Sequence, residues 1–326
     1  MQALLARAGA YEPEYGAAGL TSHLPMALVA LDRLGATRER CQDYIGWYAG
    51  ARKLAPLNLH GEFALAAKGI AESLQRRGRE ATLKALLAQL MDSVGSQAFH
   101  GMIRTAYALE AQDDSELAFA LAYWQSAPMR LPIGEADAAS SLSLEEAFRA
   151  AEKLFAPYRG CFRGQLISSV MSKVAEWPAF QQLASALPAS ECAPDRLAAV
   201  SLALFAATGD FTALHAVTGT HAFRVVSGFL DNSASAGKSL AVALLAAYAD
   251  MDAPPLPSAN ALDAWRNSAA PEWDVLATRA VASNDDHVIK VTYSAREEDA
   301  LWPDPLYRVA AYRYQHDVQR EQRQLA

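Results

Sequence analysis

The sequence predicts an all-α protein, a single multi-helical globular domain with an internal pocket. Ala and Leu are abundant, apolar residues recur at spacings of three and four, and alternating strand patterns are scarce. Hydrophobic residues make up 52% of the 326 residues and charged residues 20%, which allows a large buried core and is not typical of a disordered chain. We therefore expect residues 1–326 to form one helical domain.

Helical spacing and capping patterns identify individual elements in the first half of the chain. Apolar residues follow a helical repeat from Phe63 to Leu74 and again from Leu83 to Met91. Ser143 and Glu146 have the spacing of a capping box, in which each residue satisfies a backbone N–H of the other. This pattern predicts a helix from Ala147 to Phe155.

Two further helices are expected in the second half of the chain. Pro194 or Asp195 begins a segment that runs to about Thr208, and Gly209 is placed to end it. A β-branched cluster spans Val288 to Tyr293, but it leads into residues that favour helix. We therefore expect helix there as well.

Helix-breaking residues gather in two segments. Pro, Gly and Ser concentrate between Ala127 and Ser143, and three prolines lie between Asp252 and Ser258. The second segment is short and has Ala/Leu-rich flanks, so we expect a surface loop within one domain rather than a linker. No period of about 30 to 45 residues recurs, which disfavours a repeat solenoid.

Charge and cysteine content limit the partners. The formal net charge is −7 and no Lys/Arg-rich run forms a stripe, so no nucleic acid is expected. Residues 1–19 lack the apolar run of a signal peptide, and Leu197 to Ala207 is too short to cross a membrane. Cys41, Cys161 and Cys192 form no CxxC pair, which fits reduced thiols. We expect a cytoplasmic protein without a membrane partner; the sequence does not indicate its oligomeric state.

One segment resembles a nucleotide-binding motif without completing it. Ala236-Gly237-Lys238-Ser239 ends like a phosphate-binding loop, but Asn232 stands where the first glycine is required and no strand pattern precedes it. No GxGxxG follows a strand pattern, and HExxH, GxSxG and paired ExxH motifs are absent from the sequence. The usual nicotinamide, flavin and ferritin-like di-iron sites are therefore not encoded.

Five of the seven histidines lie in apolar segments, which places them on or near buried helix faces. A buried imidazole needs a partner for each nitrogen, and converging imidazoles meet that need around a metal ion. A lone histidine on an apolar helix is more often a core residue bonded to its neighbours, so both interpretations stay open. The five are His23, His100, His215, His221 and His287.

These segments resemble sequences characteristic of the questin oxidase-like family. The resemblance runs from about Tyr15 to Arg313, and the order and spacing of the motifs carry it more than any one motif does. The motifs are Ser22-His23-Leu24-Pro25-Met26-Ala27-Leu28, Phe99-His100-Gly101, Ala120-Leu121-Ala122-Tyr123-Trp124, Leu214-His215-Ala216-Val217-Thr218 and His287-Val288-Ile289-Lys290.

The resemblance implies an oxidoreductase that uses dioxygen on a small aromatic, polyketide-like substrate. Fungal members open anthraquinone rings in a step described as a Baeyer–Villiger-type oxidation with NADPH. Ring-cleaving relatives hold non-haem iron through four histidines and a carboxylated lysine. On this chain the implied ligands of iron, or of another divalent metal, are His23, His100, His287, Lys290 and one of His215 and His221, with His215 preferred.

The donor types are chemically coherent. His287 and Lys290 are three residues apart and share one face of a helix, so both can reach one ion. Burial lowers the pKa of a lysine, and the neutral amine can take up carbon dioxide to form a carbamate. Nitrogen and oxygen donors without thiolate suit iron or manganese, and zinc also fits. The alternative for Lys290 is a helix lysine that faces solvent.

Further residues are candidates for the substrate site. His100, Arg104 and Tyr107 follow one stripe of a helix and are candidate catalytic residues that orient an anionic or phenolic substrate; a structural hydrogen bond is the alternative for Arg104 and Tyr107. Glu110 either accepts a hydrogen bond from an imidazole or lies at a wet helix end. Aromatic residues that either line the pocket or fill the core are Trp47, Tyr48, Tyr123 and Trp124.

Two other functions stay open. One is an NADPH-dependent oxygenase without metal, in which the histidines transfer protons. The other is a non-catalytic helical protein that binds a ligand or serves as a scaffold. Histidines that converge on one point would favour the metalloenzyme, whereas histidines scattered in space would favour the scaffold.

Overall fold

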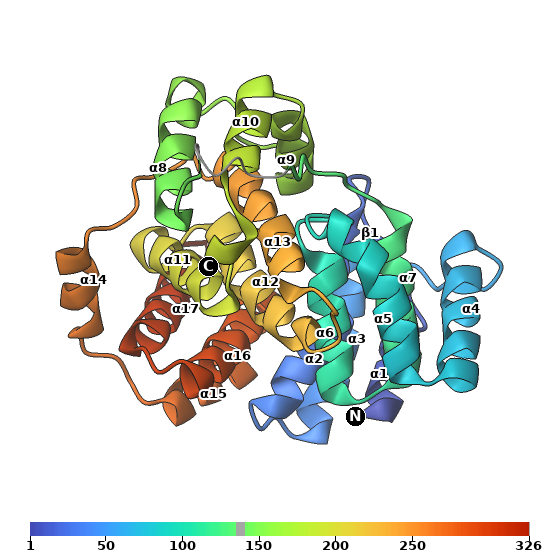
Figure 1. Ribbon diagram of the computed structural model, residues 1–326. Coiled ribbons are helices and arrows are strands. Elements are labelled where there is room, and N and C mark those ends of the chain that lie inside the picture. The colour runs from blue at the N-terminus through green and yellow to red at the C-terminus, as the bar shows by residue number, and fades with distance from the viewer. Residues whose placement is uncertain (135–140, 326) are drawn as a thin grey trace.

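The all-α prediction is confirmed. The computed structural model describes residues 1–134 and 141–325, and within them the chain forms 17 α-helices, three short 3-10 turns and one antiparallel pair of two-residue strands (Figure 1). Residues 135–140, part of the loop expected between Ala127 and Ser143, lie outside the described residues.

The N-terminal elements build one side of the molecule. A hairpin of β1 (Glu14–Tyr15) and β2 (Leu20–Thr21) leads from the first helix into the second. The helices are α1 (Gln2–Ala8), α2 (Leu24–Arg33), α3 (Arg38–Arg52), α4 (Glu62–Arg77), α5 (Arg79–Leu90), α6 (His100–Ala111) and α7 (Asp114–Ser126), with η1 (Met91–Ser93) between α5 and α6.

The remaining elements follow without further strands in the described residues. They are α8 (Leu144–Phe155), η3 (Ala156–Tyr158), α9 (Ile167–Ala175), α10 (Pro178–Ala186), η4 (Ala189–Glu191), α11 (Pro194–Thr208), α12 (Phe211–Ser227), α13 (Ser233–Tyr248), α14 (Ala259–Arg266), α15 (Trp273–Ala282), α16 (Asp286–Leu301) and α17 (Pro305–Leu325).

Local sequence signals fix several of these boundaries. Ser143 and Glu146 form the expected capping box at the start of α8. Gly209 ends α11 in the left-handed conformation, at φ 60°, which glycine adopts without a Cβ clash. The β-branched segment Val288 to Tyr293 lies inside α16, as expected, and the segment rich in proline separates α13 from α14. The capping residues, the glycine and the prolines thus lie at helix boundaries, as the sequence predicted.

Four helices meet in the interior and carry the candidate site. Helix α12 packs against α6, α11, α13 and α16, and α2 packs against both α6 and α16. In Figure 1, α8, α9 and α10 group at the top, while α4 and α14 lie at opposite flanks. The interior position of α12 explains why His215 and His221, both on this helix, are 0% exposed.

The segment that resembles a phosphate-binding loop is helical. Ala236-Gly237-Lys238-Ser239 lies inside α13, and a Cβ at position 237 would be 2.2 Å from the carbonyl oxygen of Cys192. The glycine therefore permits close packing instead of cradling a phosphate. Cys41, Cys161 and Cys192 are free. Among the described helices, none has the length and apolar character needed to cross a bilayer.

Candidate metal centre

The starts of four helices bring the predicted donors together. His23 is the N-cap of α2, and His100 is the first residue of α6. His215 lies in the second turn of α12. His287 is the second residue of α16, and Lys290 follows one turn later. These five side chains, called the donor cluster below, come from segments as far apart as residues 23 and 290.

Each imidazole ring of the donor cluster lies beside two of the others. Ring centroids are 4.6 Å apart for His23 and His100, 4.8 Å for His23 and His287, 4.9 Å for His100 and His215, and 5.4 Å for His215 and His287. One donor atom from each of His23, His100 and His215 lies within 4.8 Å of the others. Such a spacing allows several rings to reach one ion.

The Nδ1 atoms of three rings face partners of their own. Nδ1 of His23 contacts the carboxylate of Asp286, and Nδ1 of His100 contacts the carbonyl of Gln97. Nδ1 of His215 lies 2.7 Å from the carbonyl oxygen of Phe211. A carbonyl can only accept, so His100 and His215 carry their proton on Nδ1, which leaves Nε2 with a free lone pair.

Buried donor atoms without partners identify the centre of the site. Among the described residues, Nε2 of His100, His215 and His287 and Nζ of Lys290 have no hydrogen-bond partner, although each atom is buried. A buried polar atom without a partner costs about 1–3 kcal/mol. Other buried atoms of the described residues also lack partners, among them Nε2 of His221, but these four belong to the donor cluster, where an ion or a ligand would satisfy them.

Burial keeps the imidazoles uncharged and makes Lys290 easier to deprotonate than an exposed lysine, although its amine is still mostly protonated at pH 7. Burial, reinforced by the nearby Lys290, lowers the pKa of His23 to about 4 and that of His215 to about 3. Burial also holds the pKa of His100 and His287 well below the usual range. It lowers the pKa of Lys290 to about 8. Neutral imidazole and neutral amine are the forms that coordinate metals or, for the amine, take up carbon dioxide.

Asp286 is a functional candidate that the sequence analysis missed. It is 1% exposed, contacts Nδ1 of His23, and lies 3.4 Å from the guanidinium of Arg52. With His23 and His287 it forms a second group of donor atoms within 4.8 Å. Asp285 beside it is the N-cap of α16. Aspartates at a helix start are usually caps, so the sequence alone does not indicate that Asp286 is buried beside His23.

An unusual backbone segment sets the position of His100. Gln97, Ala98 and Phe99 all have positive φ, at 50°, 55° and 70°. For residues other than glycine, the left-handed conformation costs roughly 1–2 kcal/mol each. Gly101 then lets α6 approach α7, since a Cβ there would lie 2.6 Å from Cγ of Trp124. Strained backbone of this kind concentrates at functional sites.

A pocket of about 310 Å³ opens onto the donor cluster. His23, His100, His215 and His287 all line it, together with the carboxylates of Asp210 and Asp250. Its wall includes three large apolar side chains that are partly open to solvent, namely Leu20 at 40%, Leu166 at 41% and Phe211 at 48% exposure. The ring of Phe211 lies 4.5 Å from that of His215 and 4.6 Å from that of His287.

Other residues singled out by the sequence lie elsewhere. Nε2 of His221 lies 3.3 Å from Glu110, and Nδ1 lies 2.8 Å from Glu298, so the structure does not bring it to the donor cluster. Buried Arg104 forms a two-pronged ion pair with Glu116 at 2.6 and 3.1 Å. Of the two histidines on α12, His215 therefore lies in the donor cluster, and His221 lies between two carboxylates outside it.

The remaining aromatic candidates are mostly core residues. The hydroxyl of Tyr107 lies 2.9 Å from Ser294 Oγ. Tyr48, Tyr123 and Trp124 are at most 1% exposed, and Tyr48 accepts a hydrogen bond from the backbone N–H of His23. None of these four, nor Arg104 or the exposed Trp47, is among the described residues that line the 310 Å³ pocket. Their contacts favour structural roles.

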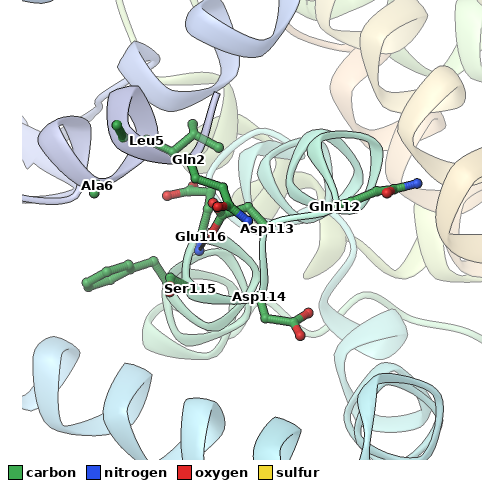
Figure 2. Close-up of a pocket in the computed structure, with 10 residues that line it drawn as sticks. Gln2, Leu5, Ala6, Gln112, Asp113, Asp114, Ser115 and Glu116 are labelled. Carbon is green, nitrogen blue, oxygen red and sulfur yellow. Dashed lines mark hydrogen bonds between the residues drawn. The ribbon is translucent and has the colours of Figure 1, made fainter.

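A larger pocket, of about 480 Å³, lies between α1 and the start of α7 (Figure 2). Its described lining includes no histidine, and its carboxylates already have partners. Glu116 binds Arg104, Asp114 binds Arg79, and Asp113 accepts the backbone N–H of Glu116 as the N-cap of α7. Volume alone therefore does not identify the functional pocket.

Comparison with known proteins supports the resemblance inferred from the motifs. A search of curated proteins gave no significant match. The family model described as Questin oxidase-like matches residues 70–295, a segment that contains every donor except His23. The family description indicates an oxidoreductase. Because the match spans more than half of the chain, the protein belongs to the questin oxidase-like family.

Proposed function

We propose that the protein is a metal-dependent oxygenase that acts on a small aromatic, polyketide-like compound. His23, His100, His215, His287 and Lys290 would hold the metal. The observation that carries the proposal is the set of buried, unpartnered donor atoms, Nε2 of three histidines and Nζ of Lys290, beside a pocket.

Donor chemistry and family together favour iron. Imidazole nitrogen with an oxygen donor suits iron, manganese and zinc, but zinc has no redox chemistry. An oxidoreductase family therefore points to a redox-active metal. Iron(II), when bound, would supply the electron density that activates dioxygen.

Lys290 is proposed as an oxygen donor in its carboxylated form. The four helix starts direct the positive ends of their dipoles toward the donor cluster, which disfavours an ammonium ion and favours an anion. The neutral amine would add to carbon dioxide and release one proton, which gives a carbamate. Lys290 is 0% exposed, so the carbamate would be shielded from bulk water.

Residues of the pocket would bind and orient the substrate. The partly exposed ring of Phe211 offers a face on which a planar substrate can stack beside His215 and His287. Burial raises the pKa of Asp210 and Asp250, both on the pocket wall. Oδ1 of Asp210 accepts the backbone N–H groups of Thr212 and Ala213, and Oδ2 of Asp250 accepts the Thr212 hydroxyl. The second oxygen of each carboxylate would accept a hydrogen bond from a phenolic hydroxyl group, while Leu20 and Leu166 would cover apolar parts of the ring system.

Metal content tests the proposal most directly. Protein purified without an affinity tag and reconstituted with iron(II) under anaerobic conditions should contain about one iron per chain by elemental analysis. The His215→Ala variant removes one donor and should retain less than about a tenth of that iron, because loss of one ligand also leaves the others poorly oriented. Oxygen uptake with a hydroxylated anthraquinone should fall in parallel.

A matched control is available in His60, an exposed histidine outside the cluster. The His60→Ala variant should bind iron as the wild type does. Full iron occupancy in His215→Ala would refute the assignment. Oxygen uptake that depends on NADPH in protein stripped of metal would instead support an oxygenase without metal.

A further inference from the structure

A second buried polar cluster ties together three of the four helices that carry the donor cluster. Helix α6 carries His100 and Glu110, and helix α16 carries His287 and Glu298. Helix α12 carries His215, His221 and Arg224. The four residues Glu110, His221, Arg224 and Glu298 are called the brace below.

The imidazole of His221 lies between carboxylates of two other helices. Its Nδ1 lies 2.8 Å from Oε1 of Glu298, and its Nε2 lies 3.3 Å from Oε1 of Glu110. Nε of Arg224 donates to the same Oε1 of Glu298 at 2.7 Å. His221 and Glu298 are both 0% exposed, so these charges face one another in a dry environment.

The proton positions follow from these contacts. Arg224 Nη2 also lies 3.3 Å from Nδ1 of His221, but Nδ1 cannot accept from Arg224 and donate to Glu298 at once. The shorter contact, at 2.8 Å, assigns the Nδ1 proton to the bond with Glu298. Burial opposes a charged imidazole, but Glu110 and Glu298 outweigh it and raise the pKa of His221 to about 9. The brace therefore contains two cations and two carboxylates.

Contacts between the donor cluster and the brace connect the same helices. The hydroxyl of Tyr107 on α6 lies 2.9 Å from Ser294 Oγ and 3.3 Å from the carbonyl oxygen of Lys290, both on α16. The rings of Tyr107 and Tyr293 approach the His221 ring edge-on, with centroids 6.0 and 5.6 Å away. The three helices are thus joined at their starts, along their length and at the brace.

We propose that His221 is a positioning residue of the candidate metal centre, which fixes α6, α12 and α16 relative to one another so that their donors converge. The inference rests on the proposed function for the identity of the centre. A helix is stiff, so a change of spacing at the brace is transmitted along it to the donor at its start. Metal affinity is sensitive to such displacements because ligands must be held to within about 0.5 Å.

The charge balance explains why removal of His221 would have a large effect. Without it, Arg224 is the one side-chain partner that buried Glu298 keeps among the described residues, and Glu110 loses the cation that faces it. An uncompensated buried carboxylate takes up a proton, draws in water or moves toward solvent, and each response weakens the ion pairs that hold the three helices together. A polar neutral residue at position 221 retains volume but not the charge.

Metal affinity in matched variants tests the inference. Affinity for cobalt(II), measured by competition with a chelator, should fall roughly tenfold in His221→Gln although all five donors are intact, in line with the effect of residues that orient ligands. The ligand-field absorption of bound cobalt(II) should also change. Glu110→Gln removes charge from the partly exposed end of the brace and should lower cobalt(II) affinity by a smaller factor. This variant replaces His221→Gln in the test if His221→Gln does not fold.

The control is a variant that lowers stability without touching the three helices. Phe148 on α8 is 1% exposed and packs on Tyr248 of α13, with ring centroids 5.2 Å apart. Phe148→Leu should lower the melting temperature, yet cobalt(II) affinity should stay at the wild-type value. Equal loss of affinity in Phe148→Leu and His221→Gln, or unchanged affinity in His221→Gln, would overturn the inference.

A measurement on metal-free protein separates this inference from the proposed function. Protein labelled with nitrogen-15 in histidine reports the imidazole signals of His23, His100, His215 and His287 without any ion. His221→Gln should shift these signals, whereas Phe148→Leu should not. Shifts in protein that fails to bind metal would reject the metalloenzyme but retain the brace, and unchanged signals would reject the brace.

Discussion

Two histidines on one helix show how surroundings decide the role of a side chain. His215 and His221 are both 0% exposed on α12, six positions apart. His215 has a carbonyl at Nδ1 and Lys290 nearby, and burial lowers its pKa to about 3. His221 faces two carboxylates, which raise its pKa to about 9. A neutral ring can coordinate a metal through its free nitrogen, whereas a charged ring that faces two carboxylates cannot.

Phe211 is expected to control substrate binding without affecting the metal. Its ring contacts the rings of His215 and His287 and is 48% exposed in the pocket, while only its backbone carbonyl binds Nδ1 of His215. Phe211→Ala removes the stacking face and keeps the carbonyl. We expect about tenfold weaker binding of a hydroxylated anthraquinone by fluorescence titration, about 1.4 kcal/mol, with unchanged iron content.

Trp47 provides the control for this experiment. It is 41% exposed on α3 and does not line the pocket in the described part of the chain. Trp47→Ala should bind the same compound with wild-type affinity. If Phe211→Ala binds as tightly as the wild type, the substrate does not stack at this position.

At the scale of elements, helix boundaries agree with those that the sequence predicts, whereas the conformation of the segment before α6 could not be predicted. Ser143 with Glu146 and Gly209 encode their boundaries locally, through side-chain caps and glycine's tolerance of positive φ. Three consecutive left-handed residues at 97–99 have no such local code, because glutamine, alanine and phenylalanine all disfavour that conformation. Tertiary contacts impose it, for example those of Gln97 with Tyr123 and Ser126.

The left-handed segment predicts an asymmetric response at position 98. Ala98 has φ 55°, where a β-branched side chain is strongly disfavoured and glycine is accommodated. We expect Ala98→Val to lower the free energy of unfolding by about 2 kcal/mol or more, and Ala98→Gly to leave it within about 1 kcal/mol of wild type. Urea denaturation of the metal-free protein measures both values.

An alanine in ordinary helix calibrates this comparison. Ala66 is exposed within α4, where valine costs only helix propensity, about 0.6 kcal/mol. A cost for Ala98→Val no larger than that for Ala66→Val would show that the segment relaxes freely. The segment would then not hold His100 in place.

At the scale of the whole molecule, the sequence did not show which distant segments come together. Motif resemblance gave His23, His100, His287 and Lys290 and preferred His215 over His221, but helical spacing cannot distinguish two histidines that are both buried. Their roles depend on Glu110 and Glu298, which come from α6 and α16. Asp286 was missed for the same reason, since its contact with His23 joins residues 263 positions apart.

Burial of neutral histidines predicts how the metal-free protein responds to acid. The pKa values of His23 and His215, about 4 and about 3, lie below the ordinary 6.5, so the unfolded chain binds protons first as pH falls. Their stabilisation is present above pH 6.5 and is lost toward pH 4. Folded His221 stays protonated, whereas the unfolded chain protonates it fully only below about pH 5.5, so His221 opposes this slope near pH 6.5 and adds none at lower pH. Each neutral histidine contributes up to about 1.4 kcal/mol per pH unit.

Urea denaturation between pH 6.5 and 4.5 measures the total slope, which also includes buried carboxylates with raised pKa such as Asp210 and Asp250. The contribution of one histidine is therefore the difference in slope between wild type and variant. His215→Gln should reduce the slope by about one proton, whereas His60→Gln, at an exposed site, should leave it unchanged. Saturating metal should steepen the loss, since the bound ion competes with protons for the same nitrogens. An identical slope in wild type and His215→Gln would mean that this histidine is not buried in the neutral form.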